Sequence, residues 1–311
     1  MRKIKLLLLT TGVSLLAAAP ADAARYNVRV GIGDQNASMF SHPDFKALKI
    51  KRVRYFIPWH AVTQPHEIQR ADEFVNAAKA ARVSVFMHIS SDNLTRRKAK
   101  LPSKKRYKRL VTELVRHYRA MGVREWGSRN EANHDSQATW KSPSRAAWEF
   151  KTVRGVCRGC TVVGLDLLDQ RGVGRYVKRY FRALGRSWRR KVSVVGIHNY
   201  SDVNRKRTSG TREIIRAVRR YNKRAKFWLT ETGGLVALST SWPYNQRRAA
   251  SRLNYMFRIT KKYRRYIQRL YIYNWTGAER GFRFDAGLVN PDGSRRPGFR
   301  VVAKQIKSFL R

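Results

Sequence analysis

The chain has 311 residues, of which 42% are hydrophobic, so it can bury a sizeable core in one or two domains. Its 67 basic and 20 acidic residues give a net charge of +47, which attracts anionic polymers such as acidic polysaccharides, envelope phosphopolymers or nucleic acid. The charge is spread over several predicted helices and no segment matches a nucleic-acid-binding module, so nucleic acid is not expected as the partner. The alternative is that basic side chains only decorate solvated helix faces.

The first 23 residues have the pattern of a signal peptide. A short basic region at Arg2, Lys3 and Lys5 precedes the apolar run LLLLTTGVSLLAAA, and ADA provides a small-residue cleavage site before Ala24. An uncleaved anchor is the alternative. No other stretch has about 18 consecutive apolar residues, so no membrane span is expected after cleavage. We therefore expect a secreted or envelope-associated protein whose mature chain, residues 24–311, is a single domain.

The sequence contains two cysteines, Cys157 and Cys160, in the spacing CRGC. The pair closes a helical stretch and precedes a strand, whereas a redox motif opens a helix after a strand. In an oxidising compartment this predicts a small structural disulfide. Two cysteines leave a structural zinc site incomplete, and we expect neither a metal nor a cofactor.

Short runs rich in β-branched and aromatic residues recur along the chain and predict eight strands. In chain order they are VRVGIG (28–33), RVRYFI (52–57), VSVFMH (83–88), VREWGS (123–128), TVVGLD (161–166), VSVVGIH (192–198), KFWLTE (226–231) and LYIYNW (270–275). Stretches with helical spacing of apolar residues lie between them, the weakest being HPDFKALK after the first strand. Alternating strands and helices predict an α/β protein, a single-domain (β/α)8 TIM barrel. A doubly wound open sheet is the alternative, but GIGDQNAS lacks the third glycine of a dinucleotide-binding turn.

Active sites of such barrels form at the carboxyl ends of the strands, so the residues at those positions are the candidates. They are rich in carboxylates, imidazoles and aromatic rings, a composition typical of a carbohydrate site. The candidates are Gly33, Asp34, Pro58, Trp59, His88, Asn130, Glu131, Asp166, His198, Tyr200, Glu231, Asn274 and Trp275.

Two glutamates stand out among the nine in the chain. Glu131 and Glu231 end the fourth and seventh predicted strands, whereas the others fall in helices, early in a strand or in a loop. Hydrolysis of a glycosidic bond needs a proton donor and a second carboxylate on the other side of the sugar ring. The two glutamates would meet that need.

The motifs around these residues resemble those of the clan A glycoside hydrolases. The matches are WGSRNEANH, IHNY, WLTETGG and YNW, followed by FDAGLVNPDGSRRPGF, in the same order along nearly all of the mature chain. The resemblance implies a retaining enzyme in which Glu131 is the acid/base and Glu231 the nucleophile. Many members carry proline after the acid/base glutamate, whereas this chain has Ala132, with Arg129 just ahead of the pair.

The resemblance also implies further roles. Glu131 must stay protonated near neutrality while Glu231 stays ionised. Arg54 is expected either to hold Glu231 in its charged form or to be a structural ion-pair partner. Asn130 would bind the sugar 2-hydroxyl. Because Asn130 and Glu131 are adjacent, both reach one site only if the strand end is bulged or already turning.

Other expected contacts follow from strand parity and aromatic character. His198 and Tyr200 project to the same side, where Tyr200 could donate to Glu231 and His198 could bind a sugar hydroxyl, or the two could be a buried polar pair. Trp275 is expected to stack on the sugar at the cleavage point, although an isolated tryptophan is more often core. The remaining candidates are His88 for a hydroxyl, Trp59 and Trp242 as sugar platforms, and Asp34 and Asp166 as polar contacts.

Two other functions compete with a glycosidase that acts on a carbohydrate polymer. One is a non-catalytic basic barrel that binds anionic envelope polymers, but a pure binder gains nothing from two strand-end glutamates. The other is a metal-dependent barrel hydrolase, which would need an H-x-H pair or a similar ligand cluster after early strands, and the sequence has none.

Overall fold

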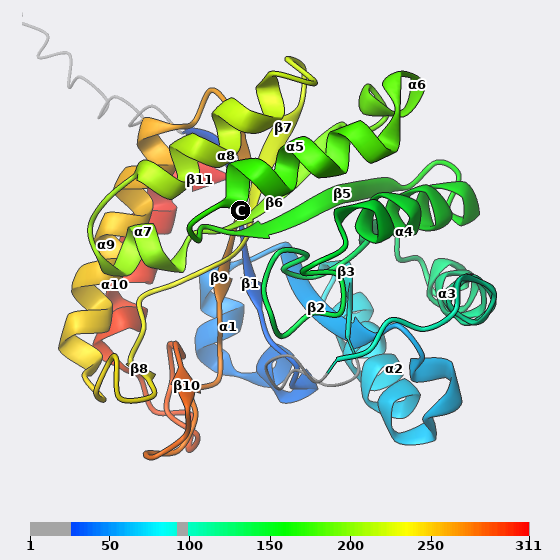
Figure 1. Ribbon diagram of the computed structural model, residues 1–311. Helices are drawn as coiled ribbons and strands as arrows, with labels where there is room; N and C mark the ends of the chain where they lie inside the picture. Colours follow the sequence, from blue (N-terminus) through cyan, green and yellow to red (C-terminus); the bar gives the residue numbers. More distant parts are fainter. Residues whose placement is uncertain (1–25, 92–98, 311) are drawn as a thin grey trace, which may run out of the picture.

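A computed structural model describes residues 26–91 and 99–310 of the chain. Eight parallel strands follow one another around a closed barrel, because the last strand pairs with the first (Figure 1). The barrel strands are β1 (Tyr26–Gly33), β2 (Arg52–Pro58), β3 (Ser84–Ser90), β4 (Glu125–Gly127), β5 (Thr161–Leu168), β6 (Val194–His198), β7 (Lys226–Thr232) and β9 (Ile267–Tyr273). The expected (β/α)8 barrel is thus confirmed, while the predicted signal peptide lies outside the described residues.

Helices surround the barrel and cover its outer face (Figure 1). They are α1 (Pro43–Leu48), α2 (Pro65–Ala80), α3 (Lys104–Ala120), α4 (Pro143–Val156), α5 (Val173–Leu184), α6 (Arg186–Arg189), α7 (Tyr200–Asn204), α8 (Ser209–Arg219), α9 (Gln246–Lys262) and α10 (Pro297–Gln305). Among the described residues no helix is long and apolar enough to span a membrane.

Helix α3 illustrates how sequence pattern becomes structure. Ser103 caps its first turn, where the side-chain oxygen accepts a hydrogen bond from the backbone N–H of Arg106 at 3.2 Å. Apolar residues recur at three- and four-residue spacing and form one buried stripe against the barrel. The buried residues are Tyr107, Leu110, Val111, Leu114, Val115 and Tyr118.

Three short strands lie outside the barrel proper. Strands β8 (Ala237–Leu238) and β10 (Phe284–Asp285) pair antiparallel in loops beyond the strand ends, and β11 (Phe309–Leu310) adds to β1. The connection after β1 is short, as expected, with a 3-10 turn followed by the six-residue helix α1.

Side chains fill the barrel interior in layers. Near the amino ends of the strands, Arg269 pairs with Glu125 at 2.6 Å and stacks on Trp228 at 3.8 Å. Above this ion pair lies a buried cluster consisting of Phe86, Val163, Val194, Trp228 and Tyr271. These layers close the barrel from below, so polar groups higher in the barrel are accessible from the carboxyl ends of the strands.

Two irregularities of strand register change which side chains face inward. Between β6 and β7, Gly196 pairs with Trp228 but His198 pairs with Glu231, so β7 has one extra residue. Strand β5 likewise has an extra residue between Val163 and Leu165. A β-bulge of this kind reverses the alternation beyond it. As a result Glu231 and Asp166 both point into the barrel.

The structure joins Cys157 and Cys160 by a disulfide at the end of α4, as the sequence predicted. Two strand predictions need correction. Strand β4 has three residues rather than six, and β9 ends at Tyr273, so Trp275 lies beyond the strand rather than at its tip.

Candidate active site

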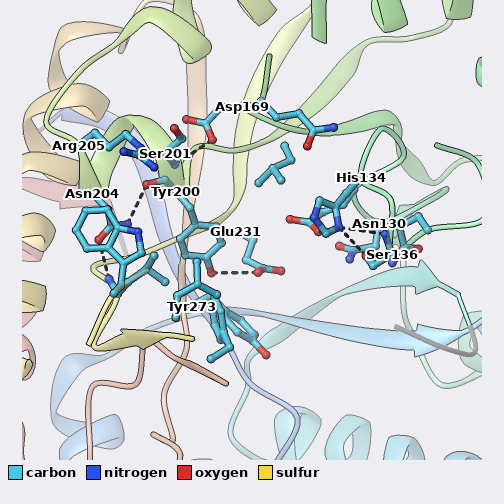
Figure 2. Close-up of a pocket in the computed structure, with 18 of the residues that line it drawn as sticks. Asn130, His134, Ser136, Asp169, Tyr200, Ser201, Asn204, Arg205, Glu231 and Tyr273 are labelled. Atoms are coloured by element: carbon cyan, nitrogen blue, oxygen red, sulfur yellow. Dashed lines mark hydrogen bonds and ion pairs between the residues drawn. The ribbon is translucent and has the colours of Figure 1, made fainter. Parts of the chain in front are cut away.

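A pocket of about 690 Å³ opens at the carboxyl ends of the barrel strands. Glu131 and Glu231 both line it. Figure 2 shows Glu231 in the pocket with Asn130 and Tyr200. The two glutamates are 100 positions apart in the chain, and the barrel brings them to one cavity.

Glu231 is held by two donors. Its Oε2 accepts a hydrogen bond from Nη1 of Arg54 at 2.7 Å. Its Oε1 accepts one from the hydroxyl of Tyr200 at 3.0 Å, which Figure 2 shows as a dashed line. Arg54 comes from β2 and is 1% exposed, so its charge faces Glu231 in a dry environment. Together the two contacts fix both oxygens of Glu231 in the pocket.

Arg54 is also the centre of a wider network. Its Nη2 donates to Oδ1 of Asn130 at 2.6 Å, and its Nε donates to Nδ1 of His88 at 3.2 Å. Burial lowers the pKa of His88 to about 3, so this imidazole is neutral and its Nδ1 is free to accept. The ring of His88 packs over Gly127, where any Cβ would lie 2.0 Å from the ring.

The chain turns where Asn130 and Glu131 leave β4, as their shared site requires. Glu131 has a φ of 38°, in the left-handed region that non-glycine residues rarely adopt. Its backbone N–H donates to Oδ2 of Asp166 at 3.1 Å, and the N–H of Ala132 donates to the Asp166 carbonyl at 2.9 Å. A proline at 132 could not donate the second bond, which gives alanine a structural role at this position.

His198 connects the carboxylates. Its Nδ1 lies 3.0 Å from Oε1 of Glu131 and 3.7 Å from Oε2 of Glu231, and its Nε2 lies 2.9 Å from Oδ2 of Asp166. Burial disfavours the imidazolium, but the charges of Asp166 and Glu231 outweigh it and raise the pKa of His198 to about 10. Asp166 keeps its position because residue 196 is glycine, where a Cβ would lie 1.8 Å from Oδ1 of Asp166.

The pKa of Glu131 departs from expectation. Burial alone would raise it, but the hydrogen bond from His198 and the charge of that ring outweigh burial and lower the pKa of Glu131. The expectation that Glu131 itself holds a proton near neutrality is therefore corrected. The contact of 3.0 Å between His198 and Glu131 thus favours an imidazolium beside a carboxylate.

Oxygens of Glu131 and Glu231 and a ring nitrogen of His198 all lie within 4.8 Å of one another. Such a set could in principle hold a cation. However, His198 already faces Glu131 and Asp166, and the guanidinium of Arg54 lies against Glu231. These fixed positive charges disfavour a second cation and favour chemistry by the two carboxylates.

Three expected sugar contacts lie elsewhere. Trp275 is 2% exposed and packs edge-on against Phe45 and Phe299, within the core. Trp59 is 4% exposed and stacks on Tyr107. His88 is fully buried beneath Arg54. None of the three lines the pocket, so their assignments to the sugar are wrong.

His198 is likewise fully buried, and it orients carboxylates instead of facing a sugar hydroxyl. Asp34 accepts backbone N–H groups of Gln35, Asn36 and Thr276, which makes it a loop anchor. Asp166 is a buried partner of His198 and does not line the pocket. Both aspartates therefore act within the protein and do not contact a substrate.

Arg129 points away from the site. Its guanidinium forms two hydrogen bonds with Glu149 of α4, at 2.8 and 2.9 Å, and a third with Ser91 at 3.2 Å. Arg129 and Asn130 thus project to opposite sides at the end of β4, and Arg129 fixes the strand end to the helical layer.

Aromatic side chains do line the pocket, but mostly not those expected. Trp242 is half-buried in its wall, as proposed, next to Phe284. Tyr273 takes the place foreseen for Trp275 at the end of β9. Inward alternation along β9 could have identified Tyr273, because Tyr271 two residues earlier fills the barrel interior.

His134 is a second pocket residue that sequence reasoning missed. Its Nδ1 lies 3.7 Å from Oε2 of Glu131. The residue is three positions after Glu131, so the turn that was already required there could have pointed to it. Its ring also accepts a hydrogen bond from the backbone N–H of Ser136 at 3.3 Å, which orients the imidazole.

No protein-family model and no curated protein sequence matches the chain. Solved structures do resemble it. A family 39 glycoside hydrolase from Bacteroides cellulosilyticus is 16% identical with a TM-score of 0.60, over 92% of this chain and 64% of that one. The xylanase XynB from Paenibacillus barcinonensis is 14% identical with a TM-score of 0.61, over 93% and 99% of the two chains.

A GH113 β-1,4-mannanase is 15% identical with a TM-score of 0.58, over 92% of this chain and 99% of that one. This chain therefore spans the full barrel of the xylanase and the mannanase but about two thirds of the family 39 enzyme. At these identities the similarity concerns the fold. The chain shares the (β/α)8-barrel fold of these three glycoside hydrolase structures.

Proposed function

We propose that this protein is a retaining glycoside hydrolase that cleaves a polysaccharide or glycoconjugate by double displacement. The observation that carries the proposal is the proximity of Glu131 and Glu231, whose oxygens lie within 4.8 Å in one pocket. Retaining enzymes place their two carboxyl groups about 5 to 5.5 Å apart, whereas inverting enzymes leave roughly 6.5 to 9.5 Å for a water molecule.

Glu231 is the nucleophile in this proposal. Arg54 and Tyr200 donate hydrogen bonds to it and fix both of its oxygens. Its carboxylate attacks the anomeric carbon, the glycosidic C–O bond breaks, and a covalent glycosyl ester forms. Water then attacks that ester and releases the carboxylate of Glu231.

Glu131 transfers the proton in both steps. It protonates the departing glycosidic oxygen and later accepts a proton from the attacking water. The hydrogen bond between Nδ1 of His198 and Oε1 of Glu131, at 3.0 Å, holds the carboxyl group in position for both transfers. Asp166, on the opposite side of the ring, holds His198 in place.

Asn130 contributes to substrate binding. Its Oδ1 is occupied by Arg54, so its amide N–H groups are left to donate into the pocket. A hydrogen bond to the sugar 2-hydroxyl strengthens in an oxocarbenium-like transition state. Trp242, Tyr273 and Phe284 supply apolar faces in the pocket wall, which suit the C–H groups of a sugar ring.

The substrate is a carbohydrate polymer in this account, and the bond cleaved is a β-glycoside. The structurally similar proteins include a xylanase and a β-1,4-mannanase, both named for polysaccharide substrates. We also propose that the protein is exported, because residues 1–23 have the pattern of a signal peptide and the disulfide of Cys157 and Cys160 suits an oxidising compartment.

The test is hydrolysis by the full chain of a panel of 4-nitrophenyl glycosides and of neutral and uronate-containing polysaccharides. Glu231→Gln should abolish turnover of the best substrate, whereas Glu113→Gln, at an exposed position on α3, should not change it. Full activity of Glu231→Gln would refute the nucleophile assignment. Binding without turnover of any substrate by the wild-type chain would support a non-catalytic polymer-binding barrel instead.

A further inference from the structure

A second cavity of about 570 Å³ runs between helices α5 and α8 on the outside of the barrel. The two helices pack side by side, as Figure 1 shows. Five basic side chains line the cavity, which we call the α5–α8 groove. They are Arg175, Lys178, Arg212, Arg216 and Arg220.

The basic residues form aligned rows. Arg212, Arg216 and Arg220 are spaced four residues apart, so they lie along one face of α8 at intervals of about one helical turn, or roughly 5.4 Å. Arg175 and Lys178 line the groove from the facing helix α5. The five side chains are exposed, while apolar residues of both helices are buried against the barrel.

In the part of the chain that the structure describes, these basic side chains are not paired with carboxylates. Over the described ranges, no carboxylate forms an ion pair with any of the five. The one acidic residue in the groove, Glu213, accepts the backbone N–H of Gly174 at 3.0 Å and so ties α8 to α5. The positive field of the groove is therefore available to an external anion.

The charge is also more one-sided here than in the chain as a whole. Residues 171–224 contain 18 Lys and Arg and only two acidic residues, compared with 67 and 20 in the full sequence. One of the two is Glu213, and the other is Asp202, which is buried and binds backbone N–H groups. General basicity of the protein does not account for a ninefold local excess.

Residues that line the groove follow closely in the chain after residues that line the active-site pocket. Arg171 lines that pocket three residues before Gly174 of the groove, and Arg207 lines it two residues before Ser209. Both helices begin after the carboxyl ends of strands, so one end of the groove lies on the same side of the barrel as the pocket. Arg205, also in the pocket wall, lies 5.8 Å from the Trp242 ring. Basic side chains thus line both the pocket and the groove.

We propose that the α5–α8 groove binds an extended anionic polysaccharide, the strand of substrate that leads away from the cleavage pocket. The charged groups it takes are carboxylates or sulfates on successive sugars. This inference rests on the proposed glycosidase function and adds the substrate class to it.

Single-stranded nucleic acid fits the groove less well, since its binding relies on aromatic side chains that stack with bases. The aromatic residue of the groove is Tyr221, and its ring is already stacked on Phe181 at 5.0 Å with an interplanar angle of 2°. Arg189 lies over the same ring at 5.2 Å. The groove therefore offers basic side chains but no free aromatic ring for base stacking, and this combination suits a polyanionic sugar chain.

The experiment measures binding by the full chain with the Glu231→Gln substitution, so that polymer is not consumed. The groove variant adds Arg212→Gln and Arg216→Gln, and the control variant adds Arg265→Gln and Arg300→Gln at exposed positions outside both cavities. Thermal unfolding checks that all variants are folded. The probes are polygalacturonate, dextran sulfate, neutral dextran and polyuridylate, each at 50 and 200 mM NaCl.

We expect the groove variant to bind polygalacturonate, dextran sulfate or both about fivefold more weakly than the parent, as two exposed charge pairs of roughly 0.5 kcal/mol would give. The control variant should weaken binding by less than twofold. Whichever probe shows the groove-specific loss identifies carboxylate or sulfate as the anion.

Equal losses in the two variants would show that net charge alone attracts the polymer and would overturn the proposal. Unchanged binding by the groove variant would overturn it as well, and so would a groove-specific loss seen with polyuridylate alone. Because binding is measured without turnover, these outcomes are independent of aryl glycoside hydrolysis by the wild-type chain, which tests the glycosidase function itself.

Discussion

Arg54 offers the sharpest test of how the site is held together. Its fully buried guanidinium binds Glu231 at 2.7 Å, Asn130 at 2.6 Å and His88 at 3.2 Å. Replacing it with methionine keeps much of the side-chain volume but leaves the carboxylate of Glu231 without its ion-pair partner. Breaking a buried pair in this way costs about 3–5 kcal/mol, because one charge remains uncompensated.

A double-mutant cycle separates that charge effect from packing. The free energy of unfolding is measured in urea at pH 7 for the wild type, Arg54→Met, Glu231→Gln and the double variant. Arg54→Met should lose about 3–5 kcal/mol, and adding Glu231→Gln should restore about 1 kcal/mol or more because no carboxylate is then stranded. Additive effects, within about 0.5 kcal/mol, would refute the assignment of Arg54 as the counter-charge of Glu231.

Three further predictions concern neighbouring residues. His198→Asn should destabilise the protein by up to roughly 5 kcal/mol at pH 6. The pKa of His198 in the folded state is about 10, above the ordinary value of 6.5, so its stabilisation of the fold is complete below pH 6.5 and lost as pH rises through 10. A difference in free energy of unfolding in urea between the variant and the wild type that does not change with pH would contradict this prediction. Tyr200→Phe removes a hydrogen bond to Glu231 and should lower kcat about tenfold in steady-state assays, whereas an unchanged kcat would exclude this role. Ala132→Pro removes the donor to Asp166 and should cost about 1–3 kcal/mol, which thermal or urea unfolding would detect, and a neutral outcome would show that the bond is dispensable.

The fold and the positions of the two glutamates could be predicted from the sequence because both depend on periodic patterns. Strands alternate with helices, and parallel strands in a closed barrel present their carboxyl ends on one side. Glu131 and Glu231 therefore converge whatever the details of packing. The turn at Asn130 was also predictable, since two adjacent residues cannot face one site from a regular strand.

Side-chain direction beyond a bulge could not be predicted. Side chains along a regular strand alternate between the two faces, so from the inward-facing Val163 the side chain of Asp166 would be expected outside the barrel. The extra residue in β5 reverses this alternation and turns Asp166 inward. The same holds for Trp228 and Glu231 in β7. A bulge has no clear sequence signature here, so the contact of Asp166 with His198 was not anticipated.

The errors at Trp275 and Trp59 have a related cause. The chain leaves β9 at Tyr273, so strand parity no longer decides where Trp275 points, and its large apolar ring packs among Phe45 and Phe299. Trp59 follows β2, and its ring stacks on Tyr107 of α3 in the helical layer. The large apolar ring of a tryptophan just past a strand end can pack in the core as well as stack on a sugar, so its position alone does not decide between the two.

The most direct test of the central claim is to trap the covalent intermediate on Glu231. The wild-type chain is incubated with a 2-deoxy-2-fluoro glycoside of the best sugar in the panel, digested with protease and examined by mass spectrometry. The account predicts time-dependent inactivation and one added glycosyl group on the peptide that contains Glu231, as a double displacement requires. A label on any other residue, or normal hydrolysis that yields a sugar of inverted configuration, would contradict it.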